Sequence, residues 1–157
     1  MHRSTIYFNS NRLLPPPSAM SRRRIPKSHY ESLAALRYAL RRFMNFSEDA
    51  ARGSGLTPQQ HQALLAIKGF PGRDYVSITE LAERLQLRHH STIGLVDRLA
   101  RANLLQRTPS IVDRRRVEVR LTPRGERVIE QLSATHLQEL RQLGPELHRL
   151  IGTIIAA

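Results

Sequence analysis

Residues 78–122 decide the fold, and they read ITELAERLQLRHHSTIGLVDRLARANLLQRTPSIVDRRRVEVRLT. Ser77 and Glu80 form the pattern of a capping box, which predicts a short helix from about residue 78. Three residues, Gln86 to Arg88, then separate it from a helix over about 89–102 with apolar residues at helical spacing. Two helices joined by so tight a turn predict a helix-turn-helix, whose second helix enters the major groove of DNA.

The second of these helices has an apolar face and a polar face. Thr92, Leu95, Val96 and Leu99 give the buried phase, and a second phase through Ile93, Val96 and Ala100 is also compatible with the spacing. The opposite face carries the side chains that would read DNA. The residues expected to form the DNA-binding recognition helix are Arg88, His89, His90, Ser91, Thr92, Gly94 and Arg98.

A β-hairpin is expected to follow this helix. Asn103 can adopt the left-handed conformation that ends a helix, and residues 104–107 can then run as a strand. Residues 117–121 alternate apolar and polar side chains, the period of a half-buried strand. Between the strands lie Thr108 to Arg116, with three consecutive arginines. A basic hairpin directly after a helix-turn-helix is a winged-helix arrangement, in which arginine at the tip suits a narrow minor groove.

Further helices flank this core on both sides. Capping-box patterns at Ser28 with Glu31 and at Thr57 with Gln60 predict helices that begin near residues 29 and 58. The apolar stripe expected along the first helix is Leu33, Leu36, Leu40, Phe43 and Met44. Thr122-Pro123 predicts another helix start, and Gly144-Pro145 predicts a break before a last short helix.

The terminal helices present more apolar surface than a small winged helix can cover. A second copy of the chain would cover it, so the sequence predicts a homodimer, while the competing interpretation folds these helices back on their own domain. The expected fold class is mainly α, a winged helix-turn-helix with a small β-hairpin wing. We expect the dimerisation helices to lie in residues 28–55 and 122–157, and the DNA-binding lobe to be formed by residues 56–121.

Charge is concentrated in the same stretch. The chain of 157 residues has a formal net charge of +12. Residues 88–121 hold eight basic and three acidic residues, net +5, which favours nucleic acid as the partner. Residues 1–27 hold six basic and no acidic residues together with four prolines, and we interpret them as a disordered basic arm.

Several classes of protein are disfavoured by what the sequence lacks. Cysteine is absent, which excludes disulfides, thiolate zinc sites and cysteine nucleophiles. No window approaches 18 consecutive apolar residues, and the first twenty residues lack the apolar region of a signal peptide. We therefore expect a cytoplasmic protein without a membrane partner.

Four stretches of the chain resemble the MarR family of bacterial transcriptional regulators. They are LTPQQHQALLAI (56–67), ITELAERLQL (78–87), GLVDRLARANLLQR (94–107) and DRRRVEVRLTPRGE (113–126). The last is the most specific, because the family's wing reads D-x-R, an alternating strand and L-T-x-x-G. The resemblance implies a helical dimer with two winged-helix lobes that binds a pseudo-palindromic operator and often represses a nearby gene.

The resemblance also implies roles for single residues. Arg115 would be the minor-groove arginine, Asp113 would orient the wing, and Arg114 and Arg116 would contact phosphates. Many family members bind small aromatic or phenolic ligands between the dimer helices and the lobe, and by analogy this ligand site would be lined by Tyr30, Arg37 and His61.

The chain departs from the family pattern at the start of the recognition helix and at its end. Arg88 stands where many members have a serine cap, Asn103 replaces a frequent glycine, and His89-His90 replaces a Ser/Pro-rich start. These changes leave the operator sequence open.

Other functions receive little support. The chain has no phosphate-binding loop, no H-E-x-x-H and no G-x-S-x-G motif, so we expect no enzyme and no cofactor. Its histidines lack the spacing of a metal site, and we interpret them as structural or DNA-facing. A sequence-tolerant architectural nucleic-acid-binding protein remains the competing hypothesis.

Overall fold

The fold consists of helices arranged around a small sheet. A computed structural model describes residues 24–110 and 117–156. Within these residues the order is α1 (Lys27–Gly53), α2 (Pro58–Lys68), β1 (Tyr75–Ser77), α3 (Ile78–Leu85), α4 (His89–Arg101), β2 (Leu105–Pro109), β3 (Val117–Leu121) and α5 (Pro123–Ile155). The chain is mainly helical with a small antiparallel sheet, which confirms the predicted winged-helix fold class.

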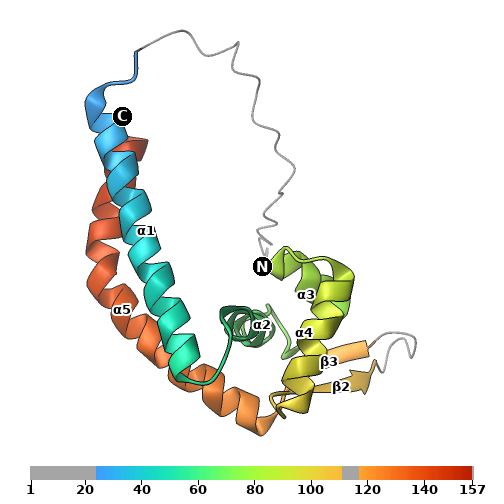
Figure 1. Cartoon of the computed structure of the whole chain (residues 1–157). Coiled ribbons are helices and arrows are strands. Elements are labelled where there is room, and N and C mark those ends of the chain that lie inside the picture. The colour runs from blue at the N-terminus through green and yellow to red at the C-terminus, as the bar shows by residue number, and fades with distance from the viewer. Residues whose placement is uncertain (1–23, 111–116, 157) are drawn as a thin grey trace, which may run out of the picture.

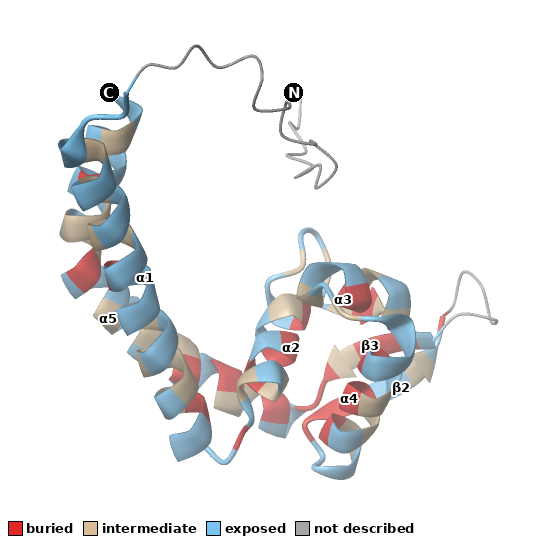
Figure 2. Cartoon of the chain, turned by 45° about the horizontal axis from the view of Figure 1, so that its top comes forward, coloured by how far each residue is buried: buried red, intermediate tan, exposed pale blue. Residues whose placement is uncertain are grey.

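The long helices α1 and α5 run side by side as an arm, and the remaining elements form a lobe at its end (Figure 1). The lobe has the larger core, to which α2, α3, α4 and the sheet all contribute buried side chains (Figure 2). The arm has a smaller core in which Ala39 of α1 packs near Leu143 and Leu150 of α5. Most of the outer surface of the arm is exposed.

Local capping signals set the starts of α2 and α3 as predicted. The Thr57 hydroxyl accepts a hydrogen bond from the backbone N–H of Gln60, whose side chain accepts one from the backbone N–H of Thr57. Ser77 and Glu80 form the same reciprocal pair at α3. These bonds satisfy N–H groups that have no partner within the helix.

The capping box predicted at Ser28 and Glu31 is wrong. Helix α1 begins two residues earlier than predicted, at Lys27 after Pro26, and the structure gives it no side-chain cap. Ser28 is therefore inside the helix. Glu31 instead pairs with Lys27 at 3.1 Å, because residues four apart are neighbours on a helix surface.

The helix-turn-helix has the predicted geometry. Gln86 ends α3 in the left-handed region with φ 53°, and the N–H of Leu87 donates to the carbonyl of Ala82 at 2.9 Å. This closes the turn within three residues. Asn103 adopts φ 56° after α4, as its position predicted. The first apolar phase is the buried one, namely Thr92, Leu95, Val96 and Leu99, while Ile93 is exposed.

The sheet contains one strand more than the predicted hairpin. Its order is β1-β3-β2, with both pairings antiparallel. Strand β1 pairs Tyr75 with Arg120 and leads directly into α3. It therefore connects the wing, by which we mean β2, β3 and the segment that joins them, to the helix-turn-helix.

The predicted break at Gly144-Pro145 is wrong, because α5 continues through Pro145 to Ile155. A proline inside a helix removes one backbone hydrogen bond and crowds the preceding turn. Here Leu143 before the proline and Leu150 after it both pack into the core shared with α1. This packing holds the helix together across the site of the local penalty.

Candidate nucleic-acid interface

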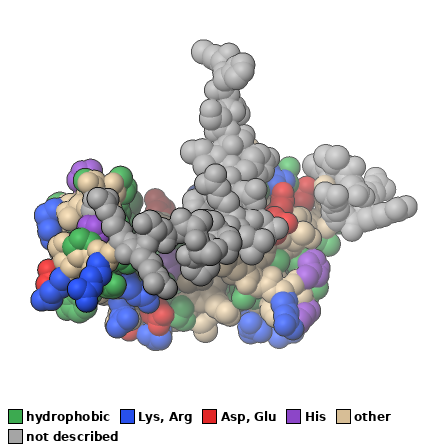
Figure 3. All heavy atoms as spheres, turned by 90° about the horizontal axis from the view of Figure 1, so that it is seen from above, with side chains coloured by type: hydrophobic (Ala, Val, Ile, Leu, Met, Phe, Trp, Pro, Cys, Tyr) green, Lys and Arg blue, Asp and Glu red, His purple; other side chains and the backbone are tan. Residues whose placement is uncertain are grey.

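Helix α4 exposes a polar and basic face at the end of the lobe. His89, His90, Ser91 and Arg98 are exposed, and Gly94 between them is half-buried. A Cβ added at Gly94 would meet only the tip of Arg98, at 3.6 Å, so this face is shallow and open. Seen from above, histidine and Lys or Arg side chains lie together at the lobe's end of the molecule, and others lie at the arm's end (Figure 3).

Arg88 and Thr92, at the start of α4, differ in position from the other residues predicted for the recognition helix. Arg88 is the residue before the helix and, among the described residues, no side chain caps it. Thr92 is fully buried, and its hydroxyl donates to the carbonyl of Arg88 at 3.2 Å. Thr92 therefore lies with the core side chains and not on the exposed face, although it was predicted among the DNA-binding residues. The uncapped N–H groups of the first turn remain able to bind an anion.

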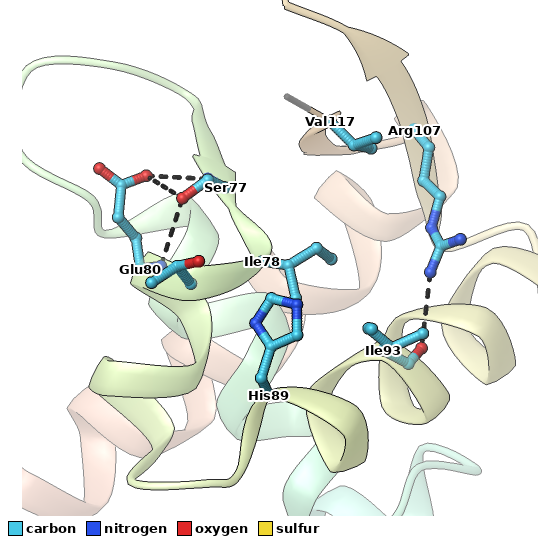
Figure 4. A pocket seen from close by; sticks show the side chains of 8 residues that line it. Ser77, Ile78, Glu80, His89, Ile93, Arg107 and Val117 are labelled. Atoms are coloured by element: carbon cyan, nitrogen blue, oxygen red, sulfur yellow. Dashed lines mark hydrogen bonds between the residues drawn. The ribbon is translucent and has the colours of Figure 1, made fainter. Parts of the chain in front are cut away.

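A groove of about 550 Å³ separates α4 from the wing strands. Ile78 from α3, Ile93 from α4 and Val117 from β3 give it an apolar lining, and His89 and Arg107 add polar nitrogen atoms (Figure 4). Ile93 and Val117 are among the exposed large apolar residues. The recognition helix and the wing thus stand on either side of one hollow.

An ion pair also joins α4 to strand β2 of the wing. Nη2 of Arg107 in β2 lies 2.7 Å from Oδ1 of Asp97 in α4, and both side chains are about one third exposed. The sequence does not reveal this pair, because its two residues are ten positions apart on a helix and a strand, and no local pattern links them.

The base of the wing contains a buried carboxylate. Glu118 in β3 is 8% exposed and accepts a hydrogen bond from Nη2 of Arg120 at 2.9 Å. A hydrogen bond with Ser110 is the main cause that lowers the pKa of Glu118, burial opposes it, and Arg120 lowers the pKa further. Glu118 is therefore ionised at neutral pH and balances the arginine beside it.

Four predicted residues of the wing tip, Asp113, Arg114, Arg115 and Arg116, lie outside the described residues. The strands on either side of them are described, and they pair in register from Leu105 with Leu121 to Pro109 with Val117. The roles given to the four residues stay predictions.

The three residues predicted to line a ligand site do not meet within one chain. Tyr30 and Arg37 are exposed on α1, whereas His61 of α2 is 4% exposed in the lobe. His61 packs on His136 of α5, which in turn contacts Ser47 of α1. Tyr30 is 17 residues before Ser47 on one helix, which corresponds to about 25 Å along its axis. The ligand site stays a prediction.

The histidine pair fills the junction between arm and lobe. The ring centroids of His61 and His136 are 4.7 Å apart, and Phe43 and Phe46 contact the ring of His136 edge-on. Nδ1 of His136 lies 2.6 Å from the carbonyl oxygen of Leu132, which can only accept, so Nδ1 carries the proton. Burial lowers the pKa of His61, and the neighbouring His136 lowers it further.

Residues 24–110 and 117–156 lack the features of a metal site and of a membrane span. No group of three histidine, aspartate or glutamate side chains there is arranged to hold a metal ion. In the same residues, no helix has the length and hydropathy needed to cross a bilayer.

Comparison with known proteins gives a consistent family match. Residues 54–116 match the model described as MarR family. Two curated relatives from Bacillus subtilis are an uncharacterized HTH-type transcriptional regulator, YsmB, and the HTH-type transcriptional repressor MdtR. YsmB is 32% identical over 68 residues, which cover 43% of this chain and 47% of YsmB. MdtR is 31% identical over 80 residues, which cover 51% of this chain and 50% of MdtR. The chain thus spans about half the length of the curated relatives it matches.

Solved structures share the fold over more of the chain. Transcriptional regulator Tm0710 from Thermotoga maritima is 27% identical with a TM-score of 0.60, over 76% of this chain and 81% of that one. A variant of MepR from S. aureus, bound to an oligodeoxyribonucleotide, is 17% identical with a TM-score of 0.61, over 83% and 99% of the two chains. Residues 54–116 thus match the MarR family, and the chain shares its winged-helix fold with these regulators.

Proposed function

We propose that this chain is a transcriptional regulator that binds a pseudo-palindromic DNA operator as a homodimer and acts as a repressor. The observation that carries the proposal is the exposed face of α4, with His89, His90, Ser91 and Arg98, next to the wing strands. This face belongs to the segment 88–121, whose net charge of +5 suits a phosphate backbone. The names of curated relatives, which include a repressor, support the same function.

The contacts divide into two kinds. Helix α4 would enter the major groove with His89, His90, Ser91 and Arg98 near base edges, while Arg88 and the uncapped first turn would hold a phosphate. Thr92 would position the helix from inside. Arg115 of the wing would reach the adjacent minor groove, where arginine is favoured by the negative potential. Asp113 would orient the wing, and Arg114 and Arg116 would contact phosphates.

A footprinting and binding experiment tests this function. The duplexes are the region upstream of the chain's own gene, including any divergently transcribed gene, and random duplexes of equal length. We expect protection of one palindrome, and Arg98→Ala and Arg115→Ala should each weaken binding by about 1–3 kcal/mol. Arg149→Ala removes the same charge from an exposed site on the arm and should leave affinity unchanged.

Two results would count against the regulator. Equal affinity for random duplexes would favour a sequence-tolerant architectural protein, and no binding to any duplex would refute DNA binding altogether. Binding should also weaken steeply as salt rises, because counterions condensed on the DNA are released by the protein's arginines.

Dimerisation is supported by two exposed apolar stripes on the arm. At 3.6 residues per turn, the α1 residues of the stripe share a face that lies away from buried Ala39. The first stripe consists of Tyr30, Leu33, Leu40 and Met44 on α1, and the second of Leu137, Leu140, Ile151 and Ile155 on α5. Two helices that each leave such a stripe in water are typical of a surface covered by a second copy.

Sedimentation of paired α1 variants tests the dimer. Leu40 is 47% exposed within the stripe, so Leu40→Glu would place a charge in the interface and should give monomers. Tyr38 is 63% exposed on another face of α1, so Tyr38→Glu should leave the oligomeric state unchanged. If both variants and the original chain sediment as monomers, the dimer is refuted.

Release of DNA by a small aromatic or phenolic ligand completes the proposal, and it rests on the family resemblance. Tyr30 and Arg37 lie on the α1 face that a second copy would cover, so a site that also uses His61 would need both chains. Aromatic acids should then raise the melting temperature of the dimer and displace DNA. Displacement that is equally strong with His61→Gln and Tyr30→Ala would refute this ligand site.

A further inference from the structure

Arginine and aromatic side chains alternate across the lobe, from α3 to the central strand of the sheet. We propose that this stack, through Tyr75 and Arg120, holds the wing at a fixed place relative to the recognition helix α4. Both would be positioning residues for DNA binding. The inference rests on the proposed function, and it assigns neither residue a contact with DNA.

The end of the stack nearest the wing is a cross-strand pair. Tyr75 in β1 stands directly opposite Arg120 in β3, and the Arg120 guanidinium lies 4.5 Å from the centroid of the Tyr75 ring. A guanidinium at this distance is attracted by the electrons of the ring face. Arg120 also donates to Glu118 at 2.9 Å, and Glu118 is buried at the base of the wing. The orientation of Arg120 is therefore set from two sides.

The other end of the stack reaches α3. The Arg73 guanidinium lies 4.9 Å from the centroid of the Tyr75 ring and 4.5 Å from that of Phe70. Arg84, in the last turn of α3, lies 4.4 Å from the Phe70 ring. Five side chains thus form a continuous series from Arg120 to Arg84.

A second connection joins the stack to the first turn of α3. Arg73 forms an ion pair with Glu80, and Glu80 also accepts hydrogen bonds from the backbone and hydroxyl of Ser77 at the helix start. Burial alone would raise the pKa of Glu80, but these bonds from Ser77 and Arg73 lower it overall. Glu80 is thus ionised at neutral pH, and the stack holds α3 near both of its ends.

This arrangement favours a role in positioning the wing over a role in stabilising the fold. The side chains of Arg73 and Arg120 are 30% and 37% exposed, and partly exposed cation–π pairs contribute little to folding. Strand β1 has only three residues, so the backbone alone gives the wing a short attachment to the helices. On the far side of the sheet, β2 is held to α4 by Arg107 and Asp97. The stack and this ion pair together hold the wing from its two edges.

Hydrogen exchange and DNA binding of Tyr75 variants test the proposal with the full-length chain. Tyr75→Leu removes the ring, and Tyr75→Phe keeps it as the matched control. We expect Tyr75→Leu to speed amide exchange in β1 and β3, with no change in α1 and α5 and a melting temperature close to the original. It should weaken operator binding about fivefold, whereas Tyr75→Phe should bind normally.

A double-variant comparison shows whether the effect passes through the wing. In an Arg115→Ala background, where the wing contributes less, Tyr75→Leu should weaken binding by less than about twofold. Equal losses in both backgrounds would overturn the positioning role, as would unchanged exchange in β3 or a Tyr75→Phe variant as weak as Tyr75→Leu. If Tyr75→Leu unfolds the lobe, Arg120→Lys provides the same comparison, because it removes the planar guanidinium from the Tyr75 ring and keeps a positive charge beside Glu118.

These experiments distinguish a failure of the proposed function from a failure of the positioning role. If the original chain does not bind a specific duplex, the proposed function is refuted whatever the exchange data show. If it binds and Tyr75→Leu binds equally well, only the positioning role is refuted.

Discussion

Replacing Gly125 by alanine should destabilise the protein by pushing α5 away from the lobe. Gly125 is buried in the first turn of α5, and a Cβ built on it would lie 2.1 Å from the carbonyl oxygen of Leu104. Contacts under 3.0 Å essentially never occur for a real Cβ, and the obstacle here is backbone. The first turn of α5 must therefore move by about 1 Å, a displacement that a close-packed interior resists.

The size of the effect follows from the contacts this movement stretches. The Thr122 hydroxyl donates to the carbonyl of Asn103 at 2.7 Å, and the Thr122 N–H donates to the carbonyl of Leu104 at 3.1 Å. Two such hydrogen bonds contribute about 2 kcal/mol. Overpacking increases the loss of stability by about 1–3 kcal/mol, and the better helix propensity of alanine offsets up to about 1 kcal/mol of it. We expect a net loss of about 3 kcal/mol.

Urea unfolding followed by circular dichroism measures this loss at fixed protein concentration, since a dimer's stability depends on concentration. For a chain of this size, the melting temperature should fall by about 10 °C. Gly152→Ala is the matched control, because a Cβ at Gly152, also in α5, meets nothing within 4 Å. Gly125→Ala with a stability at or above that of Gly152→Ala would refute the close approach of α5 to Leu104.

Two further predictions concern a helix cap and a buried histidine. Thr57→Ala removes the hydroxyl that accepts from Gln60 and should cost about 1 kcal/mol in urea unfolding, whereas Thr153→Ala in the last turns of α5 should cost less. The pKa of His61 is lowered in the folded chain, so the unfolded chain binds its proton first and stability should fall as the pH drops below about 6.5. His61→Gln should reduce the fall in melting temperature between pH 7 and pH 5, whereas His148→Gln, at an exposed position, should leave that fall unchanged. The same dependence of melting temperature on pH in both variants would contradict this account.

Signals confined to a few neighbouring residues predicted most of the fold. The caps at Thr57 and Ser77, the buried phase of α4 and the bounds of β3 all depend on contacts within one or two turns or along one strand. Local chemistry is sufficient to define such features. The alternation predicted for β3 is wrong at its start, because Val117 is exposed and Glu118 is buried. The same reasoning failed at Ser28, because the helix begins at Lys27, after Pro26, and Ser28 lies inside it.

Features that depend on distant residues escaped prediction. Strand β1 has three residues, too few for a recognisable alternation, and its pairing partner β3 lies over forty residues later. At Gly144-Pro145 the local signal for a break was strong, but packing between α1 and α5 outweighs it. In the candidate site, the exposed residues of α4 were found from their helical phase. The ion pair of Asp97 with Arg107, and the stack around Tyr75, join separate elements and leave no local pattern.

The contacts between arm and lobe limit how a dimer could control DNA binding. His61 of α2, His136 of α5 and Ser47 of α1 meet at one buried junction. Because Nδ1 of His136 donates to the carbonyl of Leu132, Nε2 of the neutral ring accepts a hydrogen bond from the Ser47 hydroxyl, 2.8 Å away. The second anchor is the first turn of α5 on Leu104. Because both contacts join the lobe to α5, the spacing of two lobes in the proposed dimer would follow the packing of the arms.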